Sequence, residues 1–174
     1  NMGEATNAFA GGTRIAVNRG EVPGPQIFTA FVVDGDPQYG HFVVRTPEDA
    51  PAIVRLAKAN GYSFMKVYTN LSAEAFAALT DEANAQGLGV VGHGVAAVGL
   101  RQQLAAGQVM VAHVEEFFTG FFPAPPADDQ QAPPDDARIA DAIALVKAHG
   151  TFVTSDLFTY RSIAAQFGKP EVVK

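Results

Sequence analysis

The sequence contains no cysteine among its 174 residues. Without thiols the chain forms no disulfide bonds, binds no zinc through thiolates and has no cysteine nucleophile. Any metal ion must therefore be bound by histidine, by carboxylates or by a less common ligand.

Basic residues are few. The 12 Lys and Arg residues stand against 18 Asp and Glu, which gives a formal net charge of −6. Nucleic-acid binding requires a concentrated basic face that neutralises phosphates, and the sequence has no basic run. We therefore expect no nucleic-acid partner.

Long apolar runs are also missing. No stretch approaches the roughly 18 to 20 residues that span a bilayer, so we expect no membrane insertion. The start, Asn1-Met2-Gly3-Glu4, lacks the basic and apolar regions of a signal peptide. Because the chain starts without an initiator methionine and stops at Lys174, we interpret both ends as cut points within a longer protein. A targeting segment upstream stays an open alternative, and the compartment is unknown.

The composition is that of one soluble globular domain over residues 1–174, with 48% hydrophobic and 17% charged residues. Short apolar runs alternate with helical patterns along it. The segment 123–134 holds five prolines and is expected to be an irregular loop. Strands are predicted at 26–33, 63–68, 88–92, 109–112 and 151–154. Helices are predicted to start at Thr46, Ser72 and Asp135 as N-caps, and near 98–106 and 161–167, with stops at Gly61, Gly87, Gly107 and Gly150.

Five strands that alternate with helices predict right-handed βαβ units and a parallel sheet. Two architectures fit this pattern: an open doubly wound sheet and part of a (β/α)8 barrel. A complete barrel needs eight strands and about 200 to 250 residues, so the barrel requires strands that this sequence does not contain.

Three potential ligands stand at the ends of consecutive predicted strands. Lys66 lies near the end of the second strand, His93 directly follows the third and His113 follows the fourth. Functional side chains gather at the carboxyl ends of strands in both architectures. The positions therefore indicate one shared site.

Each of these residues also has a structural interpretation. A lysine at a strand end can extend its ammonium into solvent, and a histidine after a strand is often only hydrogen-bonded. Lys66 shares its strand face with Phe64 and Tyr68, however, and a buried ammonium is costly unless it is paired or modified. Gly92 and Gly94 flank His93, which suits close approach of the backbone to an occupied site.

The ordered motifs Gly24-Pro25-Gln26-Ile27, Met65-Lys66-Val67-Tyr68, Gly92-His93-Gly94 and Ala112-His113-Val114-Glu115 resemble the amidohydrolase superfamily. The resemblance is to imidazolonepropionase-like and prolidase-like members, and it covers about residues 11–160. It implies an α/β fold that is a partial TIM (β/α)8 barrel, with five parallel strands and without the first and last strands.

The resemblance also implies the site. Lys66 matches a carbamylated lysine that bridges two metal ions, and His93 and His113 match metal-binding histidines. Tyr68 matches a catalytic tyrosine that contacts the reacting carbonyl, and His41 matches a histidine that holds the small-molecule substrate. The implied cofactor is a divalent metal, zinc above all, with one or two ions in the complete barrel.

The implied activity is metal-dependent hydrolysis of C–N bonds in amides, cyclic amides or dipeptides. The family's His-x-His pair is missing, no later strand supplies its aspartate, and Gln26 stands where arginine usually follows Gly-Pro. We therefore expect the chain to be inactive alone, and to need a complementing chain segment or a homo-oligomer. The alternative is a non-catalytic half-barrel that serves as a binding or assembly module. A nucleotide-binding doubly wound protein is disfavoured because no glycine-rich phosphate motif follows a strand.

Further residues near the expected site have two interpretations each. Asp156 either replaces the missing aspartate or caps the next helix, and Glu115 and Glu116 either orient ligands or lie on a solvated rim. Four phenylalanines either line a substrate pocket or cover the barrel: Phe117, Phe118, Phe121 and Phe122.

Overall fold

The computed structural model describes residues 7–38, 42–122, 134–167 and 169. Its centre is a sheet of six parallel strands in the order β2-β1-β3-β4-β5-β6. The strands are β1 Ala30–Asp34, β2 Phe42–Val43, β3 Phe64–Val67, β4 Gly89–Gly92, β5 Gln108–Val111 and β6 Phe152–Val153. The predicted α/β fold is confirmed, and the structure adds a sixth strand, the two-residue β2, to the five strands that were predicted.

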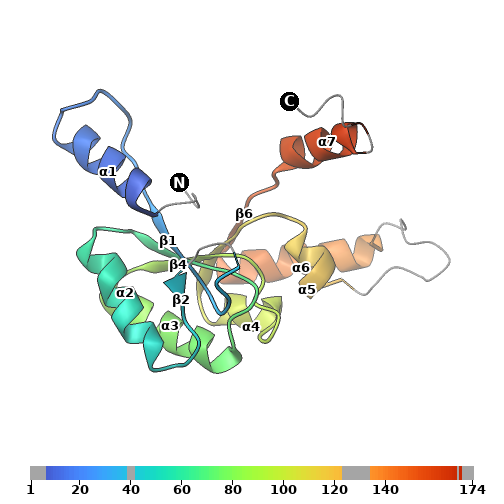
Figure 1. Cartoon of the computed structure of the whole chain (residues 1–174). Helices are drawn as coiled ribbons and strands as arrows, with labels where there is room; N and C mark the ends of the chain where they lie inside the picture. Colours follow the sequence, from blue (N-terminus) through green and yellow to red (C-terminus); the bar gives the residue numbers. More distant parts are fainter. Residues whose placement is uncertain (1–6, 39–41, 123–133, 168, 170–174) are drawn as a thin grey trace.

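Helices alternate with these strands (Figure 1). They are α1 Asn7–Asn18, α2 Asp49–Ala59, α3 Ala73–Gln86, α4 Leu100–Ala105, α5 Glu116–Gly120, α6 Asp136–His149 and α7 Leu157–Gln166. Figure 1 shows α2, α3, α4 and α6 along one side of the sheet, whereas α1 and α7 extend away from it. The alternation places all six strands in parallel, so their carboxyl ends lie along one edge of the sheet.

Two of the predicted helix boundaries are confirmed by cap contacts. Ser72 accepts a hydrogen bond from the amide of Ala75, and Asp135 accepts one from Ala137. Gly87 and Gly150 end these helices in the left-handed conformation that glycine adopts without strain.

The predicted N-cap at Thr46 was wrong, because α2 begins at Asp49. The Asp49 carboxylate instead accepts the backbone amides of Arg45 and Thr46, each at 3.0 Å. These bonds lower the pKa of Asp49. Asp49, a residue of α2 itself, thus fixes the loop before the helix. The capping pattern assigns an acid at this position only a favourable interaction with the helix dipole.

The main core lies between the sheet and helices α2 and α3. Alternate strand residues such as Phe31, Met65 and Val90 point into it and pack with Val54 and Leu79. Lys66 pairs in register with Val32 on one side and Val91 on the other, and none of these three belongs to that core. Because side chains alternate along a strand, Lys66 lies on the opposite face of the sheet from the helices α2 and α3.

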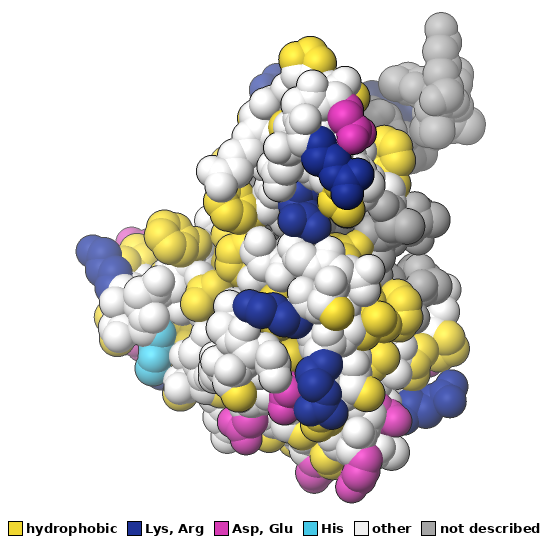
Figure 2. Space-filling model, turned by 90° about the vertical axis from the view of Figure 1, so that its left-hand side faces the viewer, with side chains coloured by type: hydrophobic (Ala, Val, Ile, Leu, Met, Phe, Trp, Pro, Cys, Tyr) yellow, Lys and Arg dark blue, Asp and Glu magenta, His cyan; other side chains and the backbone are white. Residues whose placement is uncertain are grey.

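A second core joins α4, β5, α5 and α6, and contains Leu100, Leu104, Val111, Phe117 and Ala142. Among the described residues, no helix is long and apolar enough to cross a membrane. On the face drawn in Figure 2, basic and acidic side chains are interspersed and do not gather into a basic patch.

Candidate metal centre

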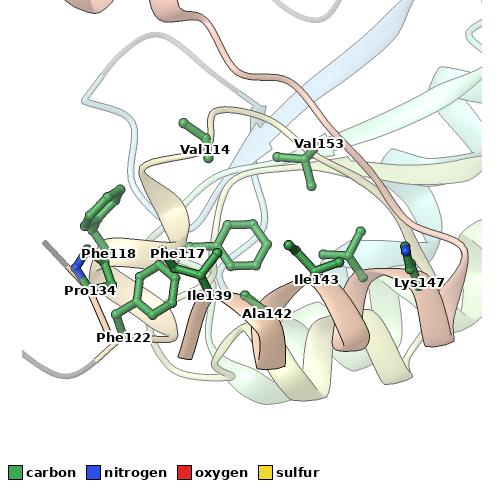
Figure 3. A pocket seen from close by; sticks show the side chains of 11 residues that line it. Val114, Phe117, Phe118, Phe122, Pro134, Ile139, Ala142, Ile143, Lys147 and Val153 are labelled. Atoms are coloured by element: carbon green, nitrogen blue, oxygen red, sulfur yellow. The ribbon is translucent and has the colours of Figure 1, made fainter. Parts of the chain in front are cut away.

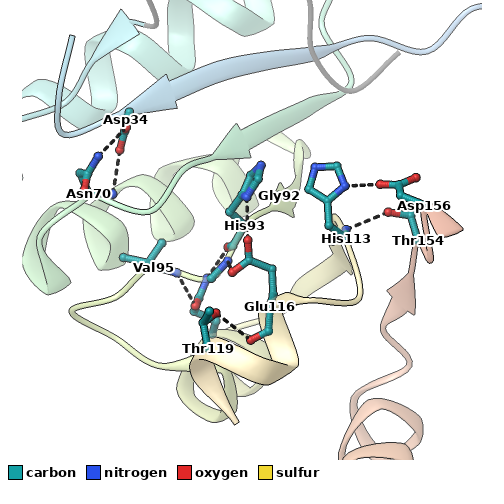
Figure 4. A network of polar contacts seen from close by, with 12 residues as sticks. Asp34, Asn70, Gly92, His93, Val95, His113, Glu116, Thr119, Thr154 and Asp156 are labelled. Atoms are coloured by element: carbon teal, nitrogen blue, oxygen red, sulfur yellow. Dashed lines mark hydrogen bonds and ion pairs between the residues drawn. The ribbon is translucent and has the colours of Figure 1, made fainter. Parts of the chain in front are cut away.

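The three expected ligands come from three adjacent strands. Lys66 lies in β3, His93 directly follows β4, and His113 stands two residues after the end of β5. Because β3, β4 and β5 are neighbours and parallel, their carboxyl ends bring the three residues to the same edge of the sheet. Figure 4 shows two of them, His93 and His113, side by side.

The side chains form a continuous series of contacts. The Lys66 ammonium lies 5.2 Å from the centre of the Tyr68 ring. The Tyr68 ring is 4.0 Å from the His93 ring, and the His93 ring is 4.8 Å from the His113 ring. Four of the five expected site residues therefore converge. The fifth, His41, lies outside the described residues and stays a prediction.

Lys66 is buried, with an exposed fraction of 6%. Burial lowers its pKa, because an ammonium loses hydration there, while the negative charges of Asp156 and Glu116 raise the pKa in part. The two carboxylates that act on Lys66 are the same ones that contact His113 and His93.

His93 is oriented by a carboxylate. Its Nδ1 lies 2.7 Å from Oε1 of Glu116, and the other carboxylate oxygen accepts the amide of Gly94 at 2.9 Å. A carboxylate only accepts, so Nδ1 donates, and in the neutral imidazole Nε2 then carries the lone pair. That Nε2 atom is buried and has no hydrogen-bond partner among the described residues.

The two glycines beside His93 allow this arrangement. A Cβ at Gly92, whose φ is 127°, would stand 2.3 Å from the carbonyl oxygen of Val67. A Cβ at Gly94 would stand 2.7 Å from Oε2 of Glu116. The backbone at position 92 thus has room only for glycine, whereas a Cβ at position 94 would displace the Glu116 carboxylate.

His113 contacts Asp156 through Nδ1, and its amide donates to Oγ1 of Thr154 at 2.9 Å. Its φ is 80° and that of Asp156 is 47°; within the described ranges these are the only non-glycine residues with positive φ. Such strained backbone concentrates at functional sites.

The carboxylates near the site take different roles. Glu116 holds His93. Asp156 precedes α7 but makes no side-chain cap bond to it, so its contact is with His113 rather than with the helix. Glu115 acts on Tyr160, whose pKa rises to about 12 through partial desolvation first and then through hydrogen bonding to Glu115. Spacing along the sequence does not determine these roles, because the contacts join separate elements.

Comparison with known proteins supports the architecture. No family model and no curated protein matches the chain. Among solved structures, a Xaa-Pro dipeptidase with bound methionine has a TM-score of 0.68 at 20% identity, and the match covers 95% of this chain and 43% of the dipeptidase. Ochratoxinase from A. niger has a TM-score of 0.68 at 16% identity, with 92% and 42% covered. Bottromycin amidohydrolase has a TM-score of 0.56 at 26% identity, with 83% and 32% covered.

The chain has the fold of part of an amidohydrolase barrel. It spans less than half the length of each of these three structures. The partial TIM-barrel fold expected from the sequence is thereby confirmed, with six parallel strands present.

Whether the described residues can hold a metal ion depends on Lys66. Within the described part of the chain, no group of three or more His, Cys, Asp or Glu side chains is placed to hold a metal ion. The two histidines are ring neighbours, and one has an unpartnered buried nitrogen. Lys66 could supply a third ligand only as a carbamate, because its ammonium cannot bind a cation. The residues fit a metal on this condition.

A separate apolar pocket of about 460 Å³ lies between α5, α6 and β6 (Figure 3). Phe117, Phe118 and Phe122 line it, together with Val114, which follows His113. The phenylalanine cluster thus lines a pocket beside the site, and three of its four members take part.

Proposed function

We propose that the chain is part of a metal-dependent hydrolase that acts on C–N bonds in amides, cyclic amides or dipeptides. The observation that carries this proposal is the buried, unpartnered Nε2 of His93, whose ring is oriented by Glu116 and lies 4.8 Å from the ring of His113. Metal-binding histidines typically have such a carboxylate on their other nitrogen. Structural neighbours that are named as a dipeptidase and an amidohydrolase support the reaction class.

In this proposal His93, His113 and a carbamylated Lys66 hold a divalent metal, with zinc as the expected ion. The neutral amine of Lys66 attacks carbon dioxide, forms an N–C bond and loses a proton, which yields an anionic oxygen ligand. Burial favours the neutral amine, because it lowers the pKa of Lys66. When bound, the metal supplies a water of lowered pKa and polarises the carbonyl.

Tyr68 has the role of a donor. Its ring lies between the Lys66 ammonium and the His93 ring. Its hydroxyl would donate a hydrogen bond to the oxygen on which negative charge develops, an interaction that stabilises the transition state more than the substrate. His41 would hold the small-molecule substrate.

The site requires further residues from a complementing segment or a second copy of the chain. Exposed apolar residues along the β6 edge support this: Phe152 is 71% exposed and Val153 36% exposed. An open strand edge with apolar side chains is a surface for strand pairing. The chain by itself is therefore expected to bind metal weakly and not to turn over substrate.

The test is metal analysis after expression with zinc and bicarbonate, followed by dialysis. The chain should retain substoichiometric zinc, and the His93→Ala/His113→Ala double variant should retain none. His149→Ala is the matched control, because His149 is exposed at the end of α6. Equal zinc retention by the double variant would contradict the proposal.

The alternative is a non-catalytic half-barrel that serves in binding or assembly, and the same open β6 edge favours it. It predicts a dimer or larger assembly that sedimentation detects equally with and without chelator. A monodisperse monomer that binds zinc would exclude this alternative.

A further inference from the structure

Two buried glutamines lie behind His93 and take no part in the ligand set proposed above. Gln103 on α4 has no exposed surface, and Gln108 on β5 is 1% exposed. A side-chain amide is costly to bury unless its donors and acceptor find partners. The partners of these two amides therefore show what the pair holds in place.

Gln103 connects α4 to the backbone that follows the His93 side chain. Its Oε1 accepts the amide of Val95 at 2.7 Å, and its Nε2 donates to the carbonyl of His93 at 3.1 Å. A backbone amide only donates and a carbonyl only accepts, so these two partners determine which end of the Gln103 amide is oxygen. The second proton of Nε2 goes to Oε1 of Gln108 at 2.8 Å.

Gln108 extends the network to the end of β4. Its Nε2 donates to the carbonyl of Gly92 at 3.0 Å and to that of Met110 at 3.1 Å. The network thus binds three backbone groups around the histidine, which are the carbonyls of Gly92 and His93 and the amide of Val95 (Figure 4).

From this geometry we infer that Gln103, supported by Gln108, is a positioning residue for the His93 imidazole. The inference rests on the proposed metal site. Glu116 determines the orientation of the ring, and Gln103 determines the place of the backbone from which the ring projects. Both are needed, because the loop after β4 contains two glycines and has little conformational restriction of its own.

The test variant is Gln103→Met, which keeps the length of the side chain and removes all three hydrogen bonds. Its control is Leu79→Ala, which removes a fully buried side chain from the main core between the sheet and α3. Zinc affinity is measured by competition with a chromophoric chelator, at a temperature at which both variants are folded. The visible spectrum of the cobalt-loaded chain reports the geometry around the metal.

Gln103→Met should weaken zinc binding about tenfold or more, as changes behind a ligand typically do, and should shift the cobalt spectrum. Leu79→Ala should lower the melting temperature and leave both readouts at the wild-type values. Wild-type affinity and an unchanged cobalt spectrum in Gln103→Met would overturn the inference while the metal site itself stands.

Amide hydrogen exchange separates this inference from the proposed function. In the metal-free chain the Val95 amide should exchange faster in Gln103→Met than in Leu79→Ala, after correction for global stability. Exchange of the Val95 amide does not depend on zinc. Faster exchange in Gln103→Met therefore supports the anchoring of the His93 backbone by Gln103, even where His93→Ala leaves zinc binding intact and the proposed function fails. Equal Val95 exchange in the two variants would overturn it.

The wild-type chain provides a measurement that needs no folded variant. The Gln103 side-chain amide protons should exchange slowly and change their chemical shifts when zinc binds. Fast exchange, or shifts that do not respond to zinc, would refute a link between Gln103 and the site.

Discussion

The side chains of His113 and Asp156 are in contact although the residues lie 43 positions apart, and both have positive φ angles. The contact joins the segment after β5 to the residue that precedes α7. We expect Asp156→Asn to keep the backbone, because asparagine tolerates the left-handed conformation, and to weaken zinc binding about 10- to 100-fold through loss of the carboxylate.

Isothermal titration with zinc measures the effect of Asp156→Asn. Asp141→Asn is the matched control, since Asp141 has a side chain that is 56% exposed and pairs with the exposed Arg138. Equal losses of affinity in the two variants would show that general charge, rather than the contact with His113, matters.

Lys66→Met should abolish zinc binding and stabilise the metal-free chain, because it removes a buried ammonium. The pKa of Lys66 is lower in the folded chain than its ordinary value of 10.5. Between these two values the unfolded chain binds more protons than the folded chain, so the free energy of unfolding rises with pH in this window.

Urea unfolding in chelator, from neutral pH up to pH 10.5, measures this dependence. The wild-type chain should gain stability relative to Lys66→Met as the pH rises. A constant difference between the two chains would indicate that Lys66 is as hydrated as in the unfolded state. Restoration of zinc binding in Lys66→Ala by added acetate would support an anionic ligand at this position.

Gly94→Ala tests the contact between Glu116 and the loop after β4. The added Cβ would stand 2.7 Å from Oε2 of Glu116, so the carboxylate must move and its hold on His93 weakens. We expect zinc affinity to fall about tenfold, as for other changes behind a ligand. In Gly12→Ala the new Cβ meets nothing within 4 Å, and zinc binding should be unchanged.

The second core predicts unequal effects for neighbouring phenylalanines. Phe117 is 5% exposed and Phe118 is 56% exposed. Phe117→Ala should reduce the free energy of unfolding by about 3–5 kcal/mol, the usual cost of emptying a buried aromatic site. Phe118→Ala should stay within about 0.5 kcal/mol, as surface changes do. Urea unfolding checks both, and comparable losses would place Phe118 in the core as well.

Much of the fold could be predicted from local sequence signals, namely helix caps and short apolar runs. Ser72 and Asp135 cap helices where the sequence indicates, because a capping bond joins residues two or three positions apart. The strands that carry Lys66 and precede His93 and His113 were also recognised, because buried parallel strands are short apolar runs. Strand β2 was missed, since two residues carry no period. Thr46 was misassigned, since it donates its own amide to Asp49 and the helix begins only at Asp49.

The sequence by itself determined that a lysine and two histidines follow one another on successive parallel strands, because alternating apolar runs and helical stripes are local patterns. Only the tertiary structure decided which carboxylate faces which imidazole, and that Gln103 holds the backbone of His93. These contacts span 23 positions for Glu116 and 43 for Asp156, and such long-range pairs depend on how the elements pack rather than on any spacing along the chain.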